Sequence, residues 1–276
     1  MGVPHWLTEG RAGLLLAFAG GAVIGMLGGL IGLGGAEFRL PLLLLFGFAA
    51  LPAVIVNKAI SLVVVTAALV FRSAAVAPEA VAAEWAVIAN LLAGSLLGAW
   101  LAAGWAIRWQ GAPLQRVMAL LLVLIAAALL LGHEPAGAEP ALQGLALRVA
   151  GVAAGLLSGI VASLLGVAGG ELLIPTLVLL FGIDLKLAGS LSLAISLPTM
   201  LVGFARYNQD NSFAVLRRHR SFVLAMAAGS VTGVAAGGLL LGVVSASLLL
   251  PMLVAVLLVS ALKTWRHANG GGEGAA

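Results

Sequence analysis

The chain has no cysteine, which excludes disulfide bridges, thiolate metal sites and thiol nucleophiles. Charge is also scarce: Asp, Glu, Lys and Arg make up only 9% of the 276 residues, whereas about 25% is typical of soluble domains. Aromatic residues account for only 6%. The remaining composition is strongly apolar, with 62% hydrophobic residues and 37 glycines. Such a chain cannot cover its surface with polar groups, so we expect an integral membrane protein.

Long apolar runs predict how often the chain crosses the membrane. A hydrocarbon core about 30 Å thick needs about 20 helical residues. Eight runs approach this length, namely 12–33, 53–71, 85–107, 114–131, 145–167, 185–204, 222–243 and 246–262. Two further runs, 38–50 and 172–183, are too short for an untilted span, and each has a proline near its start.

The positions of the basic residues predict the orientation, because Lys and Arg in short loops are retained on the cytoplasmic side. Most of the 14 Lys and Arg fall in one set of loops, including the segment 205–221 with its RRHR sequence. The alternating loops, around Glu79 and in the segment 133–143, hold mainly acids. We therefore expect both termini to be cytoplasmic. The net charge of +4 is then an orientation signal, and we expect no nucleic-acid partner.

An internal repeat appears when the chain is shifted against itself by 134 residues. The segment Gly20–Pro41 then aligns with Ala154–Pro175, with seven identities. These include Glu37 with Glu171, each followed four residues later by a proline, in a chain that has only eight glutamates. The loops that follow the second span of each copy are predicted on opposite sides of the membrane. The two copies are therefore predicted to be inverted.

These observations predict an all-α polytopic membrane protein built from two inverted repeats. Each repeat is expected to hold about five helical segments, four long spans plus one short proline-containing helix, and a count of eight spans is the alternative. The predicted units are a cytoplasmic N-terminal tail (1–11), the first membrane repeat (12–132), an external linker (133–143), the second membrane repeat (144–264) and a cytoplasmic C-terminal tail (265–276).

Both copies carry a cluster of glycines followed by a glutamate and, four residues after it, a proline. This pattern is typical of helix breaks inside hydrophobic sequence. Glycines free the backbone, and we expect each proline to occupy the first turn of the short helix that follows. Unwound backbone inside a membrane persists only where protein or water satisfies it, and the positive N-terminal end of each short helix favours an anion. The predicted helix-break residues are Gly32, Pro41, Gly166 and Pro175.

Polar residues near these breaks form the predicted substrate site. A carboxylate in the membrane is costly to keep charged, so Glu37 and Glu171 are suited to carry a proton together with substrate. The alternative is that each glutamate caps the short helix or pairs with a neighbour such as Arg39. Arg39 is either an anion-binding charge or a snorkelling residue, and Lys58 is either an anion contact or an interfacial anchor. The serine hydroxyls and the asparagine amide of the site either bind substrate or join neighbouring helices. The predicted substrate-binding residues are Gly34, Gly35, Glu37, Arg39, Asn57, Lys58, Ser61, Gly169, Gly170, Glu171, Ser192 and Ser196.

The paired glycine-rich, proline-terminated motifs and the stretch Gly169–Tyr207 resemble the TauE/SafE sulfite-exporter family, a group of bacterial inner-membrane permeases. Two positions depart from the usual triple glycine, since Ala36 stands third in the first copy and Ala168 first in the second. The resemblance implies a multi-pass permease of the bacterial cytoplasmic membrane. It would move a small anion such as sulfite, a sulfonate or sulfoacetate, with proton coupling as one option.

Other classes of function fit less well. The histidines lie in tails or loops, so no intramembrane serine protease or haem site is expected, and the glycine-rich motifs lack the lysine of a nucleotide loop. We therefore predict no enzyme, catalytic residue, metal or cofactor. A passive anion channel is the main alternative, with a membrane anchor subunit or an intramembrane enzyme behind it. The expected partners are a small anionic substrate and membrane lipid, and a homo-oligomer is left open.

Overall fold

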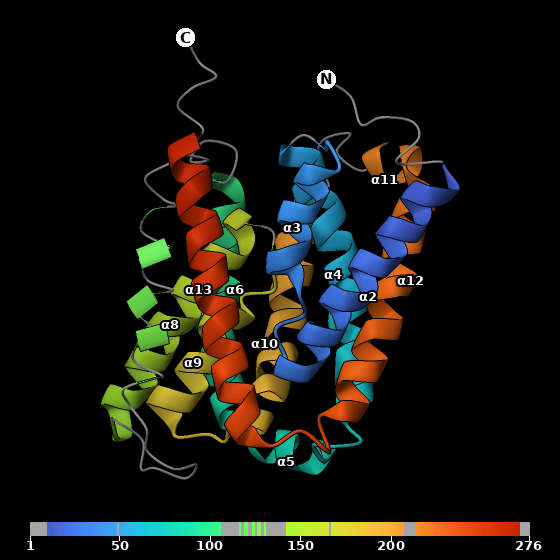
Figure 1. Cartoon of the computed structure of the whole chain (residues 1–276). Helices are drawn as coiled ribbons and strands as arrows, with labels where there is room; N and C mark the ends of the chain where they lie inside the picture. Colours follow the sequence, from blue (N-terminus) through green and yellow to red (C-terminus); the bar gives the residue numbers. More distant parts are fainter. Residues whose placement is uncertain are drawn as a thin grey trace.

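The computed structural model describes residues 10–48, 50–105, 142–165, 167–206 and 214–270, together with isolated positions between 116 and 130. Every regular element in this part of the chain is a helix (Figure 1). Six of these helices are long and apolar enough to cross a membrane. The predicted all-α polytopic membrane fold is confirmed.

The helix bounds follow the apolar runs of the sequence. The first half of the chain contains α2 (Arg11–Ile31), α3 (Ala36–Leu45), α4 (Ala50–Arg72), α5 (Pro78–Ala83) and α6 (Trp85–Trp105). The second half contains α8 (Gly144–Leu165), α9 (Gly170–Phe181), α10 (Leu185–Arg206), α11 (Ala214–Arg218), α12 (Arg220–Leu240) and α13 (Ala246–Gly270). The predicted run 114–131, the linker 133–143 and the N-terminal tail lie largely outside the described residues.

Helix α13 continues past the apolar run. It reaches Gly270, so the first residues of the predicted C-terminal tail, from residue 265, are helical. The apolar run ends near Leu262, and the residues that follow it are compatible with a helix until the glycines begin.

Each half contains a helical hairpin in which the chain turns back inside the bundle. Helix α2 ends at Ile31 and α3 runs back beside it, and α8 and α9 form the same arrangement (Figure 1). The reversal depends on backbone that L-residues with side chains rarely adopt: φ is 80° at Gly34, 72° at Gly35 and 78° at Gly169. The predicted breaks are therefore real turns of the chain. Gly166 lies outside the described residues.

The two prolines do not form the breaks, which corrects the expectation for Pro41 and Pro175. Each is the sixth residue of its short helix, counting from Ala36 in α3 and from Gly170 in α9. The glycines make the turn by themselves, so the helix has already started when the proline is reached. A proline at this position has no N–H to donate to the carbonyl four residues earlier, and it therefore interrupts the hydrogen-bond ladder at Glu37 and Glu171.

Helices α2 and α12 pack so closely that their backbones touch. A Cβ at Gly21 would collide with the carbonyl of Met226, and one at Gly25 would collide with that of Ser230. The contact is reciprocal, since a Cβ at Gly229 would meet the carbonyl of Phe18. Small residues at four-residue spacing give this approach in a membrane, where van der Waals contact replaces the hydrophobic drive.

Helices α6 and α8 repeat the same interface with the halves exchanged. A Cβ at Gly159 would collide with the carbonyl of Ser95, and one at Gly94 with that of Val152. Gly159 lies 134 residues after Gly25, and Ser95 lies 135 residues before Ser230. Each pair thus joins the first helix of one half to the corresponding later helix of the other half.

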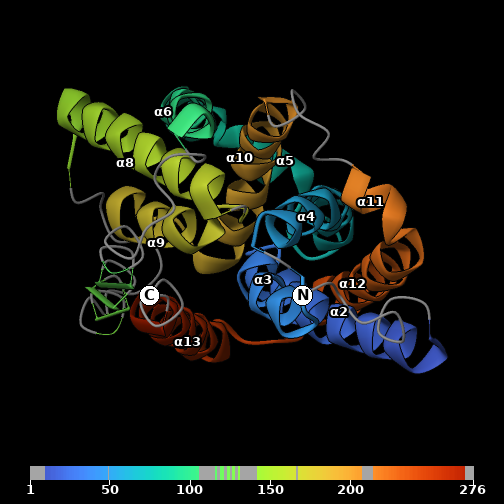
Figure 2. The same ribbon diagram turned by 90° about the horizontal axis from the view of Figure 1, so that it is seen from above.

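The central layer of the bundle contains the interrupted helices. Seen from above, α3, α4, α9 and α10 lie between the pair α2 and α12 and the pair α6 and α8, while α13 lies at the periphery (Figure 2). Helix α10 packs against α4, α6 and α9. This arrangement places both breaks inside the molecule.

Candidate functional site

The two helix breaks meet at the centre of the bundle. A Cβ at Gly170, the first residue of α9, would lie 3.2 Å from the Cα of Leu33. A Cβ at Gly34 would lie 3.5 Å from the Cβ of Ala168. All four residues are buried. Four of the predicted site glycines, at 34, 35, 169 and 170, are therefore brought into one buried region.

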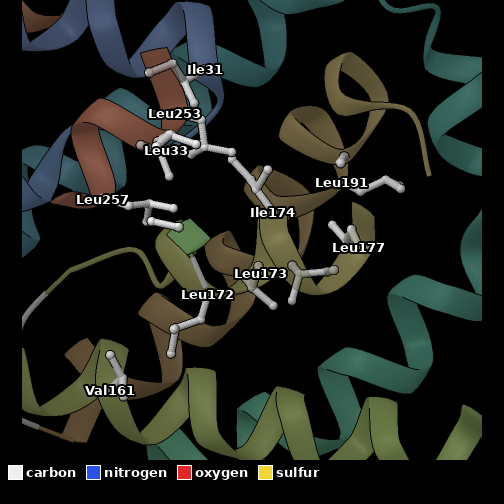
Figure 3. Close-up of a cluster of buried hydrophobic side chains, with 14 of the residues drawn as sticks. Ile31, Leu33, Val161, Leu172, Leu173, Ile174, Leu177, Leu191, Leu253 and Leu257 are labelled. Atoms are coloured by element: carbon white, nitrogen blue, oxygen red, sulfur yellow. The ribbon is translucent and has the colours of Figure 1, made fainter. Parts of the chain in front are cut away.

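One side of this meeting point is apolar. Leu33 of the first break belongs to a buried cluster with Ile174 of α9 and Leu253 of α13, and the close-up shows these side chains near one another (Figure 3). The same cluster holds Ile31, Leu257, Leu172, Leu173, Leu177, Leu191 and Val161. These apolar side chains keep water away from this side of the breaks.

The other side of the meeting point carries the guanidinium of Arg39, which is fully buried. Its Nη1 donates to Ser61 Oγ at 2.8 Å and to Asn57 Oδ1 at 3.5 Å. Its Nη2 donates to Ser230 Oγ at 3.4 Å and to the carbonyl of Gly34 at 3.5 Å. Three of the predicted site residues, Arg39, Asn57 and Ser61, thus form one cluster beside the first break. A snorkelling position for Arg39 is excluded by its burial.

Asn57 also fixes the start of α3. Its Nδ2 donates to the carbonyl of Ala36, the first residue of that helix, at 3.1 Å. The amide therefore connects α4 to the break and to Arg39 simultaneously. This double contact holds the guanidinium and the free N–H groups of the α3 N-terminus on the same side of the break.

The two glutamates occupy the second position of their short helices. Glu171 is buried in the first turn of α9, where an acidic side chain complements the positive helix end. The backbone of Glu37 takes the equivalent position in α3. The side chain of Glu37 lies outside the described residues.

Lys58 reaches from α4 to the second half of the molecule. Its Nζ donates to the carbonyl of Ser163, near the end of α8, at 3.3 Å, and its side chain is buried. A plain interfacial anchor is therefore excluded. The contact is with the interrupted helix of the second half.

The hydroxyls of α10 do not form a second copy of the Arg39 cluster. Ser192 donates to the carbonyl of Gly32 at 2.8 Å and to that of Gly189 at 2.9 Å, so it supports the first break from the second half. Ser196 is buried, and its Oγ has no hydrogen-bond partner within the described residues. The reason is a substitution between the halves, because Leu173 stands where the first half has Arg39.

Two buried polar groups were not predicted as site residues. Arg72 donates four hydrogen bonds near the first break, and Ser230 contacts Arg39 from α12. Arg72 has a signal in the sequence, since it is a basic residue at the end of an apolar run next to an acidic loop. Ser230 has none beyond its place in a glycine-rich helix, because only the packing of α12 against α2 and α4 brings it to the site.

Helix breaks that meet in the middle of a membrane-spanning bundle, with a buried arginine, amide and hydroxyls on one side, define a polytopic membrane protein with an enclosed polar centre.

A comparison with protein families identifies which group this is. The family model described as sulfite exporter TauE/SafE matches residues 17–264, and the chain belongs to this family. Its members are membrane permeases and not enzymes, which confirms the predicted membership, the class of transport protein and the absence of an enzymatic role. Neither a curated protein nor a solved structure shows significant similarity to the chain.

Proposed function

We propose that the protein is a secondary permease that carries a small sulfur-containing or carboxylated anion across the bacterial cytoplasmic membrane. The observation that supports this most directly is the meeting of the two breaks, at Leu33–Gly34 and Ala168–Gly170, beside the buried guanidinium of Arg39. The proposed site lies between these breaks.

Three features of the site favour an anion. The short helices α3 and α9 both begin at the breaks, so their N-terminal N–H groups and positive dipole ends face the region. Arg39 adds a full positive charge with planar donors that suit sulfonate, sulfite or carboxylate oxygens. Asn57 and Ser61 supply uncharged hydrogen bonds nearby. A cation would meet like charge at the two helix N-termini and at Arg39.

Two observations support the inverted arrangement of the halves, which alternating access in permeases commonly uses. Helix α5 of the first half and helix α11 of the second half follow equivalent spans, and they lie at opposite ends of the bundle (Figure 1). The two glycine interfaces, α2 with α12 and α6 with α8, also match with the halves exchanged. An inverted repeat accounts for both.

The face that carries α11 is the proposed cytoplasmic face. Exposed Arg217, Arg218 and Arg220 lie there, close to Arg11 at the start of α2, whereas the α5 face carries Glu79 and Glu84. Basic residues are retained on the cytoplasmic side. Both ends of the described chain, at the start of α2 and the end of α13, lie on this α11 face (Figure 1).

Proton coupling through the glutamates completes the proposal. Glu171 is buried next to the breaks, where the negative charge is costly unless it is neutralised or paired. A proton bound there in one step and released in the next would link anion movement to a pH gradient. Glu37 is the equivalent residue of the first half.

The experiment that tests the function is flux into liposomes containing the purified protein. Sulfite, an organic sulfonate and a carboxylate are each compared with and without a pH gradient, and counterflow separates a carrier from a channel. We expect Arg39→Met to lower anion flux by about 10- to 100-fold, because hydrogen bonds to a charged group contribute about 1.5–3 kcal/mol. Arg39→Lys should retain part of the flux, since it keeps the charge.

The matched control is Arg148→Met, which removes an exposed arginine of α8. This variant should transport at the wild-type rate. Wild-type flux in Arg39→Met, in protein that remains folded, would refute the proposed site. Absence of flux for all three anion classes in the wild-type protein would refute the proposed substrate class.

A further inference from the structure

Arg72, the last residue of α4, is buried with 1% of its surface exposed. Its Nη1 donates to the carbonyls of Gly29 at 2.6 Å and Leu30 at 2.8 Å. Its Nη2 donates to the carbonyl of Lys186 at 2.8 Å, and its Nε donates to Ser190 Oγ at 3.1 Å. One side chain therefore makes four hydrogen bonds, all of them 3.1 Å or shorter.

These partners belong to different halves of the molecule. Gly29 and Leu30 lie in the last turn of α2, directly before the first break, whereas Lys186 and Ser190 lie in the first turns of α10. Arg72 thus joins the end of one interrupted helix to the start of a helix in the other half. Because α4 leads into α5 after Arg72, the junction lies toward the α5 face.

The backbones also close around this junction. A Cβ at Gly32 would collide with the backbone of Gly189, so α10 touches the first break directly. Ser192 adds its hydrogen bond to the Gly32 carbonyl one turn further along α10. Toward the α5 face, the backbones of the two halves are therefore in direct contact at the break.

Charge and helix ends make this contact costly to loosen in part. The carbonyls of the last turn of α2 carry the negative end of the helix dipole, and a guanidinium there is stabilised. A buried guanidinium needs its donors satisfied, so it cannot release one half gradually without leaving N–H groups unpaired. Either the whole set of bonds across α2 and α10 holds, or the junction opens and water replaces the partners.

We propose that Arg72 is a positioning residue that keeps the route between the halves closed on the α5 face, and that its bonds to one half break when the proposed site opens there. The inference rests on the proposed transport function. It assigns the residue no direct contact with the transported anion. Its role is to set the access of the site to one side of the membrane.

The absence of cysteine makes this directly measurable, because a single introduced thiol is the only one in the protein. Ser192→Cys places this thiol at the break, where the native side chain is fully buried. Membrane-bound protein is then treated with a membrane-impermeant thiol reagent, applied to one face at a time and without any anion substrate. The rate of labelling reports access to the break from each face.

Arg72→Met in this background removes the charge and all four bonds while it keeps a long side chain. We expect labelling from the α5 face to rise by about tenfold, in line with the loss of hydrogen bonds to a charged group, while labelling from the α11 face stays the same. Ser73→Ala is the matched control, because within the described part of the chain its exposed hydroxyl donates only to the carbonyl of Val70 in the last turn of α4. It should not change either rate.

Equal rates in wild type and Arg72→Met, or an equal rise from both faces, would overturn the proposal, since a merely structural loss loosens the protein on both sides. Ser190→Ala removes only one of the four hydrogen bonds of Arg72 and serves as the test if Arg72→Met does not fold. It should raise the labelling rate from the α5 face alone. Labelling needs no flux, so the absence of transport in liposomes would leave this result intact and would count against the proposed function only.

Discussion

Two buried arginines of the first half have different surroundings, and the difference separates their roles. Arg39 is held mainly by side chains, the amide of Asn57 and two hydroxyls, at distances up to 3.5 Å. Arg72 is held mainly by backbone carbonyls at shorter distances. Side-chain partners can rotate toward an incoming anion, whereas carbonyls at a helix end are fixed. Arg39 is therefore the better candidate for a ligand contact and Arg72 for a structural junction.

At the residue scale, Ser61 and Ser196 form a matched pair for a stability test. They are 135 residues apart and occupy equivalent positions in α4 and α10. Ser61 accepts a hydrogen bond from Arg39 at 2.8 Å, so Ser61→Ala should lower the free energy of unfolding by about 1.5–3 kcal/mol. Ser196→Ala should be neutral or slightly stabilising, because it removes a buried hydroxyl that has no partner within the described residues.

Thermal unfolding of the two variants in the same detergent measures this difference. Anion transport gives a second measurement. Because Ser61 belongs to the proposed anion site, Ser61→Ala should also raise the KM for the anion, whereas Ser196→Ala should leave it unchanged. Equal losses of stability in the two variants would mean that the Arg39 cluster contributes no more than any buried hydroxyl.

At the scale of elements, helix α4 holds both interrupted helices by their carbonyl ends. Arg72 binds the carbonyl of Gly29 in α2, and Lys58 binds the carbonyl of Ser163 in α8. Gly29 and Ser163 are 134 residues apart, so the two carbonyls occupy the same position of the repeat. A positive charge stabilises such a helix end in each half. One span of the first half thus supports the breaks of both.

The glycine interfaces give a prediction at the same scale. Gly25→Ala and Gly159→Ala each introduce a methyl group that collides with a backbone carbonyl of the facing helix, at Ser230 and at Ser95. Backbone cannot move aside as a side chain can, so each variant should lose about 1–3 kcal/mol of stability. The loss should be similar in both, since the two interfaces are equivalent.

Gly242→Ala is the control for this series, because the nearest atom to its added Cβ would be 3.7 Å away, at ordinary contact distance. Its unfolding temperature should remain close to that of the wild type. If the two interface variants were as stable as this control, close backbone packing would not be what joins α2 to α12 and α6 to α8.

At the scale of the whole molecule, the proposed inverted arrangement of the halves predicts the sides on which equivalent loops lie. Ala77 precedes α5, Ala214 begins α11, and both are exposed. Ala77→Cys and Ala214→Cys, each in the cysteine-free chain, should be labelled by an impermeant thiol reagent from opposite faces of the membrane. In the proposed orientation, the basic residues around α11 put Ala214 on the cytoplasmic face. Labelling of both from the same face would contradict the inversion.

Much of the fold was predictable because lipid imposes simple rules on sequence. Spans must be long and apolar, so the runs that became α2, α4, α6, α8, α10 and α12 could be found by length alone. The breaks were predictable because glycine clusters recur with a glutamate and a proline at fixed spacing. The position of the prolines was wrong, since a sequence pattern does not reveal at which residue the next helix starts.

The site was only partly predictable, for reasons of packing. Arg39, Asn57 and Ser61 lie within 22 residues of one another, and helical spacing can suggest that they share a region. Ser230 is 191 residues from Arg39, and nothing local points to its contact with the guanidinium. Lys58 and Arg72 act on carbonyls, which every residue has and which therefore leave no trace in the amino-acid pattern.

The amino-acid sequence by itself determined the solvent of this protein, the kind of its longer helices and the two places where the chain turns back. These follow from local composition, because hydropathy and glycine spacing act within one turn or one span. Only the tertiary structure decided that the two turns meet, that Arg39 lies on their polar side and that Arg72 joins the halves. Those contacts depend on which helices pack together, and small residues spread across four helices set that packing through close approach of backbones.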